Sequence, residues 1–320
     1  MYLTIDRDLL HQFEEQLDPL CPEAGKITAK VLGYGEISTV FAIGDDDLAY
    51  KRMPIFQADG ELQAYEHIYD EYNRLLVEDI GIQIPPYGRV SLISEGERPV
   101  LYIVQQKLNP DSIGDHAMQM LGREDVLRLV RAVLFELKKV WSFNHTQVGL
   151  DVAIDGQISN WSIQGFDPDH PAFDPDIDLL YLDTSTPLYR IDGVEQLDAE
   201  LFLRSAPSFL AWVLRRFFLD DVVGRYYDFH RVVVDLIANF YKEQRSELVP
   251  DLIDLANDFF TTEAAALNVE PITLEEVQAY YREDAFIWRL YQGARRLDRW
   301  LHTTLLRKPY PYILPGPVTR

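Results

Sequence analysis

Two aspartates and an asparagine in the middle of the chain have the types and spacing that a metal-dependent phosphoryl transfer requires. Asp155 and Asn160 are separated by four residues in the segment VAIDGQISNW, directly after a long apolar stretch with helical periodicity. The carboxylate of Asp155 can accept a proton from a hydroxyl group, and the amide oxygen of Asn160 can bind a divalent cation. Asp183 follows the apolar run 179–182, where its carboxylate can take metal ions that bridge phosphates. Taken alone, Asp155 with Gly156 also fits an ordinary Asp-Gly turn.

A second group of residues, nearer the N-terminus, has the properties of a triphosphate site. Gly33 and Gly35 interrupt a strand-like run, and Val40 follows them. Glycine lets the backbone bend sharply over a phosphate with no Cβ in the way, so that N–H groups can face the oxygens. Lys51 ends the next apolar strand, at 48–50, where a lysine would be an unusual choice unless it faces an anion. Individually, these features equally fit a glycine hairpin and a solvated lysine at a strand end.

The segment 61–76 has apolar residues at a helical period and carries the acidic residues that could hold the lysine in place. Glu66 and Glu71 flank the apolar stripe on opposite sides, so either could reach Lys51. Glu61 lies on the stripe in the first turn, where it favours the helix dipole. A solvated glutamate is the alternative for all three.

The surrounding elements predict two unequal parts of an α+β fold. Residues 26–108 have the order β-β-β-α-β-β, after an N-terminal helical extension over 1–25. Residues 109–305 begin with a strongly periodic helix within 124–143, continue through a short strand-rich stretch, and are then almost entirely helical. One of the later helices is expected over 201–219, and the last begins at a capping box of Thr273 and Glu276. The proline-rich tail, 306–320, is expected to lie extended on the surface.

Charge limits the range of partners. The chain of 320 residues has 52 acidic and 30 basic side chains, a formal net charge of -22. This field repels phosphate backbones and anionic lipid, so we expect neither nucleic acid nor a membrane as partner. A bound triphosphate would need local positive charge, backbone N–H groups and metal. The single cysteine, Cys21, fits a reducing compartment, and without a signal peptide or an apolar run long enough for a spanning helix the expected location is the cytoplasm.

These motifs, in this order, resemble the protein-kinase-like superfamily, and are nearest its aminoglycoside/choline phosphotransferase branch. LGYGEISTV is similar to the glycine-rich loop, AYK to the strand with the triphosphate lysine, and LYIVQQKL to the strand that enters the hinge. DEYNRLL is similar to the helix that bears the glutamate partner of that lysine. The resemblance implies a small antiparallel-sheet N-lobe with one helix, a large mainly helical C-lobe, and ATP and Mg²⁺ as cofactors.

The resemblance also implies a role for each matching position. Asp155 would be the catalytic residue, and Asn160 and Asp183 the metal ligands. Glu71, in preference to Glu66, would pair with Lys51, and the backbone of 106–108 would pair with adenine. The nucleotide-binding positions it implies are Gly33, Gly35, Val40, Lys51, Glu71, Gln106 and Leu108.

Three departures argue against a conventional protein kinase. Ala153 stands where the family has histidine or tyrosine, Gln157 where protein kinases have lysine, and Ser185 where the metal-binding triplet has glycine. No closing Ala-Pro-Glu is present either. Two functions therefore stay open. One is a phosphotransferase for a small-molecule hydroxyl acceptor, with a cationic amine as one candidate. The other is a kinase-like pseudoenzyme that binds nucleotide or a protein partner without phosphoryl transfer. Nucleotidyl transfer is a third alternative.

Overall fold

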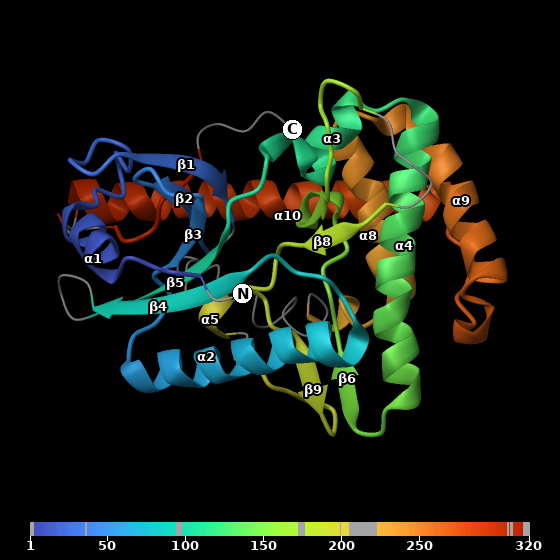
Figure 1. Cartoon of the computed structure of the whole chain (residues 1–320), viewed down its shortest axis with the longest axis horizontal. Coiled ribbons are helices and arrows are strands. Elements are labelled where there is room, and N and C mark those ends of the chain that lie inside the picture. Colours follow the sequence, from blue (N-terminus) through green and yellow to red (C-terminus); the bar gives the residue numbers. More distant parts are fainter. Residues whose placement is uncertain are drawn as a thin grey trace.

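The computed structural model describes residues 3–35, 37–93, 98–171, 177–198, 200–204, 223–305, 307 and 310–315. Apart from the short helix α5 (Glu200–Leu203), the helix expected over 201–219 lies outside the described residues. The rest forms two lobes, a small one built on a sheet and a larger helical one, so the predicted two-lobed kinase-like α+β fold is confirmed (Figure 1).

The N-lobe is a five-stranded antiparallel sheet with the spatial order β1-β2-β3-β5-β4. Its strands are β1 (Ala29–Tyr34), β2 (Thr39–Ile43), β3 (Leu48–Met53), β4 (Tyr87–Ile93) and β5 (Pro99–Gln106). Helix α2 (Asp59–Arg74) and a π-helical turn (Leu75–Ile80) connect β3 to β4. This is the predicted β-β-β-α-β-β order.

The register of the sheet aligns the residues of the expected triphosphate site. Gly33 on β1 lies opposite Val40 on β2, and Val40 lies opposite Lys51 on β3. Lys51 in turn pairs with Ile103 on β5. Three of the positions singled out from the sequence therefore form one row across neighbouring strands.

The two faces of the sheet are covered by different helices because successive side chains of a strand point to opposite faces. Tyr50 and Tyr102 belong to the core under α1 (Arg7–Gln16), whereas Leu101 and Ile103 pack with the tyrosines of α2. Lys51, between Tyr50 and Arg52, therefore lies on the α2 side of the sheet, which is also the side of the C-lobe.

The C-lobe is built around α4 (Arg123–Thr146), whose predicted apolar stripe is buried against α8 (Phe229–Lys242) and α9 (Val249–Thr262). The other elements of this lobe are α3 (Gly114–Met120), β6 (Leu150–Val152), β7 (Trp161–Ile163), β8 (Leu179–Tyr181), β9 (Tyr189–Ile191) and β10 (Val194–Glu195). The strands β7 and β8 form a two-stranded antiparallel sheet beside the N-lobe. Among the described helices, none has the length and apolar character needed to cross a membrane.

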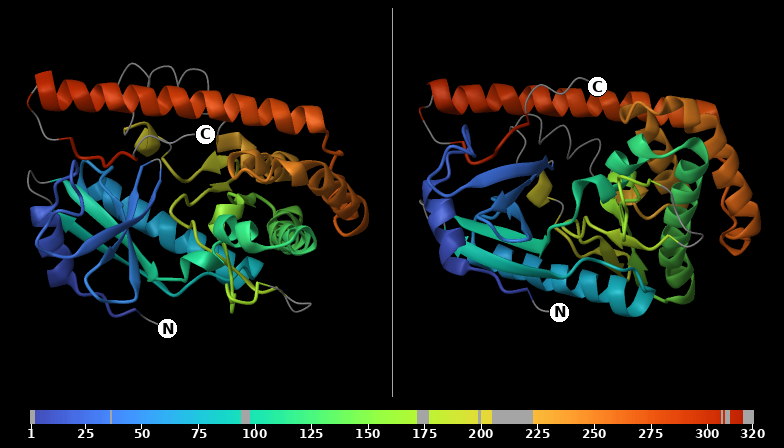
Figure 2. Two further views of the ribbon diagram at one scale, coloured as in Figure 1. Left: turned by 90° about the horizontal axis from the view of Figure 1, so that it is seen from above. Right: turned by 45° about the horizontal axis from the view of Figure 1, so that its top comes forward.

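The last helix, α10 (Leu274–Trp300), extends from the C-lobe back along the N-lobe (Figure 2). It begins at the predicted cap, where the side chain of Thr273 accepts a hydrogen bond from the backbone N–H of Glu276. Residues 310–315 form neither helix nor strand, and the expected position of this segment on the surface is wrong, because Tyr310, Ile313 and Leu314 are buried. Ile313 joins the core of the N-lobe under α1. The C-terminal part of the chain thus contacts both lobes.

Candidate active site between the lobes

The two lobes are joined by an ion pair between Lys51 and Asp183. Lys51 Nζ donates to Asp183 Oδ1 at 2.7 Å, and the same oxygen accepts bonds from Ser185 Oγ at 2.6 Å and from the Ser185 backbone N–H at 3.2 Å. Burial opposes the charge of Asp183, but Lys51 and Ser185 outweigh it and hold the pKa of this carboxyl below its usual value. None of the hydrogen bonds given by the described residues goes to Asp183 Oδ2.

The small sheet of β7 and β8 brings Asn160 to Asp183. Trp161 pairs with Tyr181 across this sheet, and the backbone N–H of Leu182 donates to the carbonyl of Asn160 at 2.8 Å. Asn160 directly precedes β7, and Asp183 comes two residues after the end of β8. Because the two strands are antiparallel, both residues lie at the same end of this small sheet. The side-chain Nδ2 of Asn160 donates to the backbone carbonyl of Asp155 at 3.3 Å, which fixes the amide and leaves its oxygen as a ligand atom.

Asp155 is held in a partly buried turn beside this pair. Its Oδ1 accepts the backbone N–H of Gln157 at 3.1 Å. Burial, the charge of Asp235 and that of Asp183 raise the pKa of Asp155 to about 7. Gly156 is needed for packing rather than for an unusual backbone angle, because a Cβ there would lie 2.7 Å from Val232 Cγ1 and 3.1 Å from Leu137 Cδ1. Helices α4 and α8 thus approach the turn too closely for any side chain.

A buried carboxylate that the sequence analysis did not identify lies behind Asp155. Asp235, on α8, accepts a hydrogen bond from Gln157 Nε2 at 3.2 Å and another from Asn239 Nδ2 at 3.0 Å. Burial raises the pKa of Asp235, and the positive charge of Arg225 opposes this. The guanidinium of Arg225 lies over the rings of Tyr226 and Tyr280, 5.3 and 5.6 Å from their centroids. A single aspartate within the apolar run VVVDLIAN was the available signal in the sequence.

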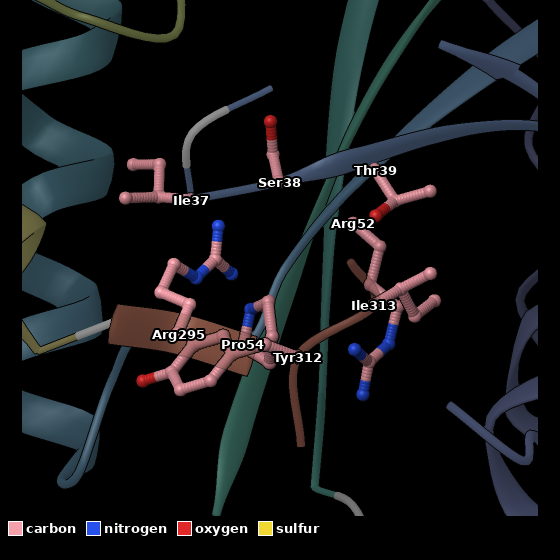
Figure 3. A pocket seen from close by; sticks show the side chains of 8 residues that line it. All are labelled: Ile37, Ser38, Thr39, Arg52, Pro54, Arg295, Tyr312 and Ile313. Carbon is pink, nitrogen blue, oxygen red and sulfur yellow. The ribbon is translucent and has the colours of Figure 1, made fainter. Parts of the chain in front are cut away.

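The glycine turn is closed by a backbone hydrogen bond from Gly35 N–H to Ser38 O at 3.0 Å. A Cβ on Gly35 would lie 2.5 Å from Ser38 Oγ, whereas a Cβ on Gly33 would meet nothing within 4 Å. A small hollow beside this turn is lined by residues of β2, β3, α10 and the 310–315 segment (Figure 3). Within it, the side chain of Arg295 points toward Ile37 and Ser38. The α10 helix thus lines the same hollow as the segment that follows the glycines.

The expected adenine-binding backbone is only partly available. The N–H of Gln106 donates to Pro86 O at 3.0 Å, and that of Lys107 donates to Asp47 O at 2.7 Å. Among the described hydrogen bonds, none uses the N–H of Leu108, so this is the hinge donor that a nucleobase could meet. The N–H of Gln106 is engaged because the end of β5 still pairs with its neighbours there, so pairing of Gln106 with adenine stays a prediction.

The expected ion pair between Lys51 and Glu71 is not formed. Glu71 pairs with Arg74 at 2.8 Å, and the alternative, Glu66, lies 3.4 Å from Arg89. The face of α2 that is turned toward the site carries Tyr65, Tyr69 and Tyr72, all buried. Since neighbouring helix positions differ by about 100°, Glu66 and Glu71, each next to one of these tyrosines, point toward the arginines at the helix surface. The carboxylate that takes the ammonium of Lys51 is Asp183 instead.

The donor atoms fit a hard divalent cation. Within the described part of the chain, no three His, Cys, Asp or Glu side chains gather to hold a metal by themselves. Mg²⁺ does not require such a cage, since it is commonly bound by one or two carboxylates together with substrate phosphates and water. Asp183 Oδ2 and the amide oxygen of Asn160 are oxygen atoms of the kind that Mg²⁺ prefers, and the ammonium of Lys51 lies beside the first of these groups.

The fold and this site together define a kinase-like chain in which a lysine, two aspartates and an asparagine meet between two lobes. The chain belongs to a family described as a family of unknown function (DUF6206), whose model matches residues 22–299. No curated protein sequence matches it.

Solved structures with partial likeness include WaaP in complex with acyl carrier protein, at 15% identity and a TM-score of 0.31, covering 71% of this chain and 89% of that one. A mutant of aminoglycoside 2'-phosphotransferase-IIIa in its GDP complex has 16% identity and a TM-score of 0.26, covering 79% and 92%. The wild-type GDP complex of that enzyme has 12% identity and a TM-score of 0.25, and the match covers 73% of this chain and 92% of that one. At these values the likenesses carry no conclusion about function, which has to come from the site.

Proposed function

We propose that the protein is an ATP- and Mg²⁺-dependent phosphotransferase that acts on a hydroxyl group of a small molecule. The observation that carries this proposal is the 2.7 Å ion pair between Lys51 and Asp183. It joins the strand beside the glycine turn to a carboxylate whose neighbours are Asn160 and Asp155. A phosphate-binding lysine, a carboxylate–amide pair for metal and a nearby proton acceptor are the parts that phosphoryl transfer needs.

The residues divide the work as follows. Bound ATP and Mg²⁺ supply the phosphoryl group and neutralise the charge that develops on its oxygens. Asn160 and Asp183 hold the metal, and Lys51, whose ammonium has two further protons, holds phosphate oxygens. Leu108 donates its backbone N–H to the nucleobase. Local positive charge and metal thereby offset the net charge of -22.

Asp155 orients the acceptor hydroxyl and takes its proton. A general base works best when its pKa lies near the operating pH, and burial together with Asp235 raises the pKa of Asp155 to about 7. Asp155 is therefore largely ionised just above neutral pH, and still basic enough to accept a proton.

The acceptor side favours a cationic molecule. Asp235 is close enough to Asp284 for that charge to raise its pKa, and Asp235 acts in the same way on Asp155. Three carboxylates in one region, with Arg225 as a counter-charge, attract an amine more strongly than a neutral or acidic acceptor.

A pseudoenzyme remains the second candidate because of Gln157. At the position where protein kinases carry a lysine, its amide is hydrogen-bonded to Asp235, and Ala153 has no group that could assist Asp155. A chain of this kind would bind nucleotide without transferring a group. Nucleotidyl transfer would need the same binding residues and differs in its products.

Thermal melting with and without Mg·ATP, repeated for Asp183→Asn, separates these functions. Ligand at 100 times its dissociation constant stabilises the folded protein by about 2.7 kcal/mol. We expect this gain for the wild type and its loss in Asp183→Asn. Unchanged melting of the wild type would refute nucleotide binding altogether. Stabilisation without turnover across a panel of amines would favour the pseudoenzyme, and release of pyrophosphate instead of ADP would indicate nucleotidyl transfer.

A further inference from the structure

Three tyrosines on one face of α2 reach into the two segments that carry the catalytic and metal-binding aspartates. Tyr65, Tyr69 and Tyr72 are spaced four and three residues apart, so they share a face of the helix. Each is at most 1% exposed. The acidic partners for Lys51 that were expected from the sequence, Glu66 and Glu71, flank this face on opposite sides.

Each hydroxyl meets the site at a different point. Tyr65 donates to the backbone carbonyl of Ser185 at 2.7 Å, two residues after Asp183. Tyr72 donates to the carbonyl of Ala153 at 2.8 Å, two residues before Asp155.

Between these two contacts, Tyr69 accepts a hydrogen bond from the hydroxyl of Thr184 at 3.3 Å. Thr184 directly follows Asp183. The three contacts therefore lie within two residues of Asp155 or Asp183 along the chain.

The hydroxyls of Tyr65 and Tyr72 stay protonated and act as donors. Burial, followed by the charges of Tyr69 and Asp183, raises the pKa of Tyr65 well above its usual value. Burial and the charges of Asp183 and Asp155 do the same for Tyr72.

We propose that Tyr65, Tyr69 and Tyr72 are positioning residues that set Asp183 and Asp155 relative to Lys51, in place of the lysine–glutamate pair. This inference rests on the proposed function, since positioning has meaning only for a site that binds metal and nucleotide. Tyr65 acts through the segment 183–185 on the metal, and Tyr72 acts through the segment 153–155 on the proton acceptor.

The helix has a separate anchor, so loss of one hydroxyl does not release it. Glu61, in the first turn of α2, forms an ion pair with Arg204 at 2.7 Å and accepts the backbone N–H of Gln57 at 2.9 Å. Arg204 also donates to the carbonyl of Ile55 at 3.1 Å. Tyrosine-to-phenylalanine variants keep the ring in the core, and we expect them to fold.

The test compares Tyr65→Phe with Tyr102→Phe as a matched control. Tyr102 is equally buried, and its hydroxyl also has a partner, Glu14, but on the opposite face of the sheet. Binding of a fluorescent ATP analogue is measured once with Mg²⁺ and once with EDTA. Tyr65→Phe should weaken binding with Mg²⁺ by about 3- to 10-fold, the worth of one hydrogen bond. In EDTA, the affinity of Tyr65→Phe for the analogue should stay within twofold of wild type. The affinity of Tyr102→Phe should stay within twofold of wild type both with Mg²⁺ and with EDTA.

Hydrogen exchange gives a second readout that needs no ligand. In the free protein, Tyr65→Phe should speed exchange of the amides in 183–188, and Tyr72→Phe those in 153–157, while Tyr102→Phe changes neither segment. Equal Mg²⁺ and EDTA effects in Tyr65→Phe, or no effect on binding beside a lowered melting temperature, would show that the tyrosines are only core residues. A wild type that binds no nucleotide under either condition would refute the proposed function, and with it this inference.

Discussion

The side chain of Gln157 connects the turn of Asp155 to the buried carboxylate of Asp235, to which it donates a hydrogen bond at 3.2 Å. Asp235 is a second negative charge next to the proposed base. Because like charges disfavour ionisation of each other, Asp235 contributes to the raised pKa of Asp155, after the larger effect of burial. The groups of neighbouring elements that act on the same carboxyl are Asp183 and Arg225, with opposite signs.

The first prediction is a shift of the pH–rate profile in Asp235→Asn. Asp155 must be ionised to accept a proton, so activity should rise with pH around a midpoint of about 7. Removing the charge of Asp235 lowers the pKa of Asp155, and the rise should move to lower pH by roughly 1 unit. The measurement is ATP turnover between pH 5 and 9. Asp254→Asn, an exposed aspartate of α9, changes the net charge equally and should leave the midpoint in place. If the midpoint were the same in wild type, Asp235→Asn and Asp254→Asn, the charge of Asp235 would not act on the pKa of Asp155.

The second prediction concerns stability. A carboxyl whose pKa is raised in the folded state stabilises the fold at pH values below its unfolded pKa, and this contribution is lost as the pH rises through the folded pKa of about 7. Asp155→Asn mimics the protonated form. We therefore expect it to be more stable than wild type at pH 8, by on the order of 1–3 kcal/mol, with an advantage that is smaller at pH 5 and vanishes only below the unfolded pKa of about 4. Chemical denaturation at the two pH values measures this. If Asp155→Asn were less stable than wild type at pH 8, the ionised carboxylate of Asp155 would have to be stabilised by its neighbours, against the prediction.

Much of the N-lobe could be predicted because its signals are local. Alternating strands, glycine turns and one periodic helix fix the order of elements, and the spacing of Asp155 and Asn160 follows from a single turn. The partner of Lys51 could not be predicted, because it depends on which face of α2 is turned inward. Glu66 and Glu71 lie at equivalent positions beside the apolar stripe. Glu71 is bound by Arg74 in the next turn of α2, and Glu66 by Arg89 on β4.

Long-range packing accounts for the rest. Asp235 is a single polar residue in an apolar helix, and only the fold reveals that Gln157 reaches it from 78 residues away. The return of α10 to the N-lobe was also not predictable, since a helical period does not specify which elements it covers.

The third prediction is that Lys51→Ala weakens Mg·ATP binding far more than it weakens the fold. Lys51 is about one-fifth exposed, so its ion pair with Asp183 is only partly shielded from solvent. We expect at least a 10-fold loss of affinity and a change of about 1 kcal/mol or less in the free energy of unfolding of the free protein. Titration of ATP with melting curves tests both. Lys30→Ala, at an exposed position on β1, is the control. Unfolding of Lys51→Ala would mean that the lysine is structural and the site assignment wrong.

The fourth prediction concerns the ion pair by which Arg52 on β3 binds α1, next to its hydrogen bond with the 310–315 segment. Arg52 donates to both oxygens of Glu14 on α1, at 2.6 and 2.8 Å, and to the carbonyl of Pro311 at 3.1 Å. Both side chains of the ion pair are almost completely buried. Glu14→Gln leaves a buried cation without its counter-charge, which typically costs about 3–5 kcal/mol.

Urea denaturation of Glu14→Gln, with the exposed neighbour Glu15→Gln as control, measures that cost. Burial raises the pKa of Glu14, but the hydrogen bond and charge of Arg52 outweigh it, so the pKa is lowered overall. The ion pair therefore stabilises the wild type above the unfolded pKa of about 4.5 and is lost as the pH falls through the lower folded value. The difference between wild type and Glu14→Gln should accordingly shrink below pH 4. A difference that is small at pH 7, or that does not change with acid, would show that α1 and the 310–315 segment are held to β3 by apolar packing alone.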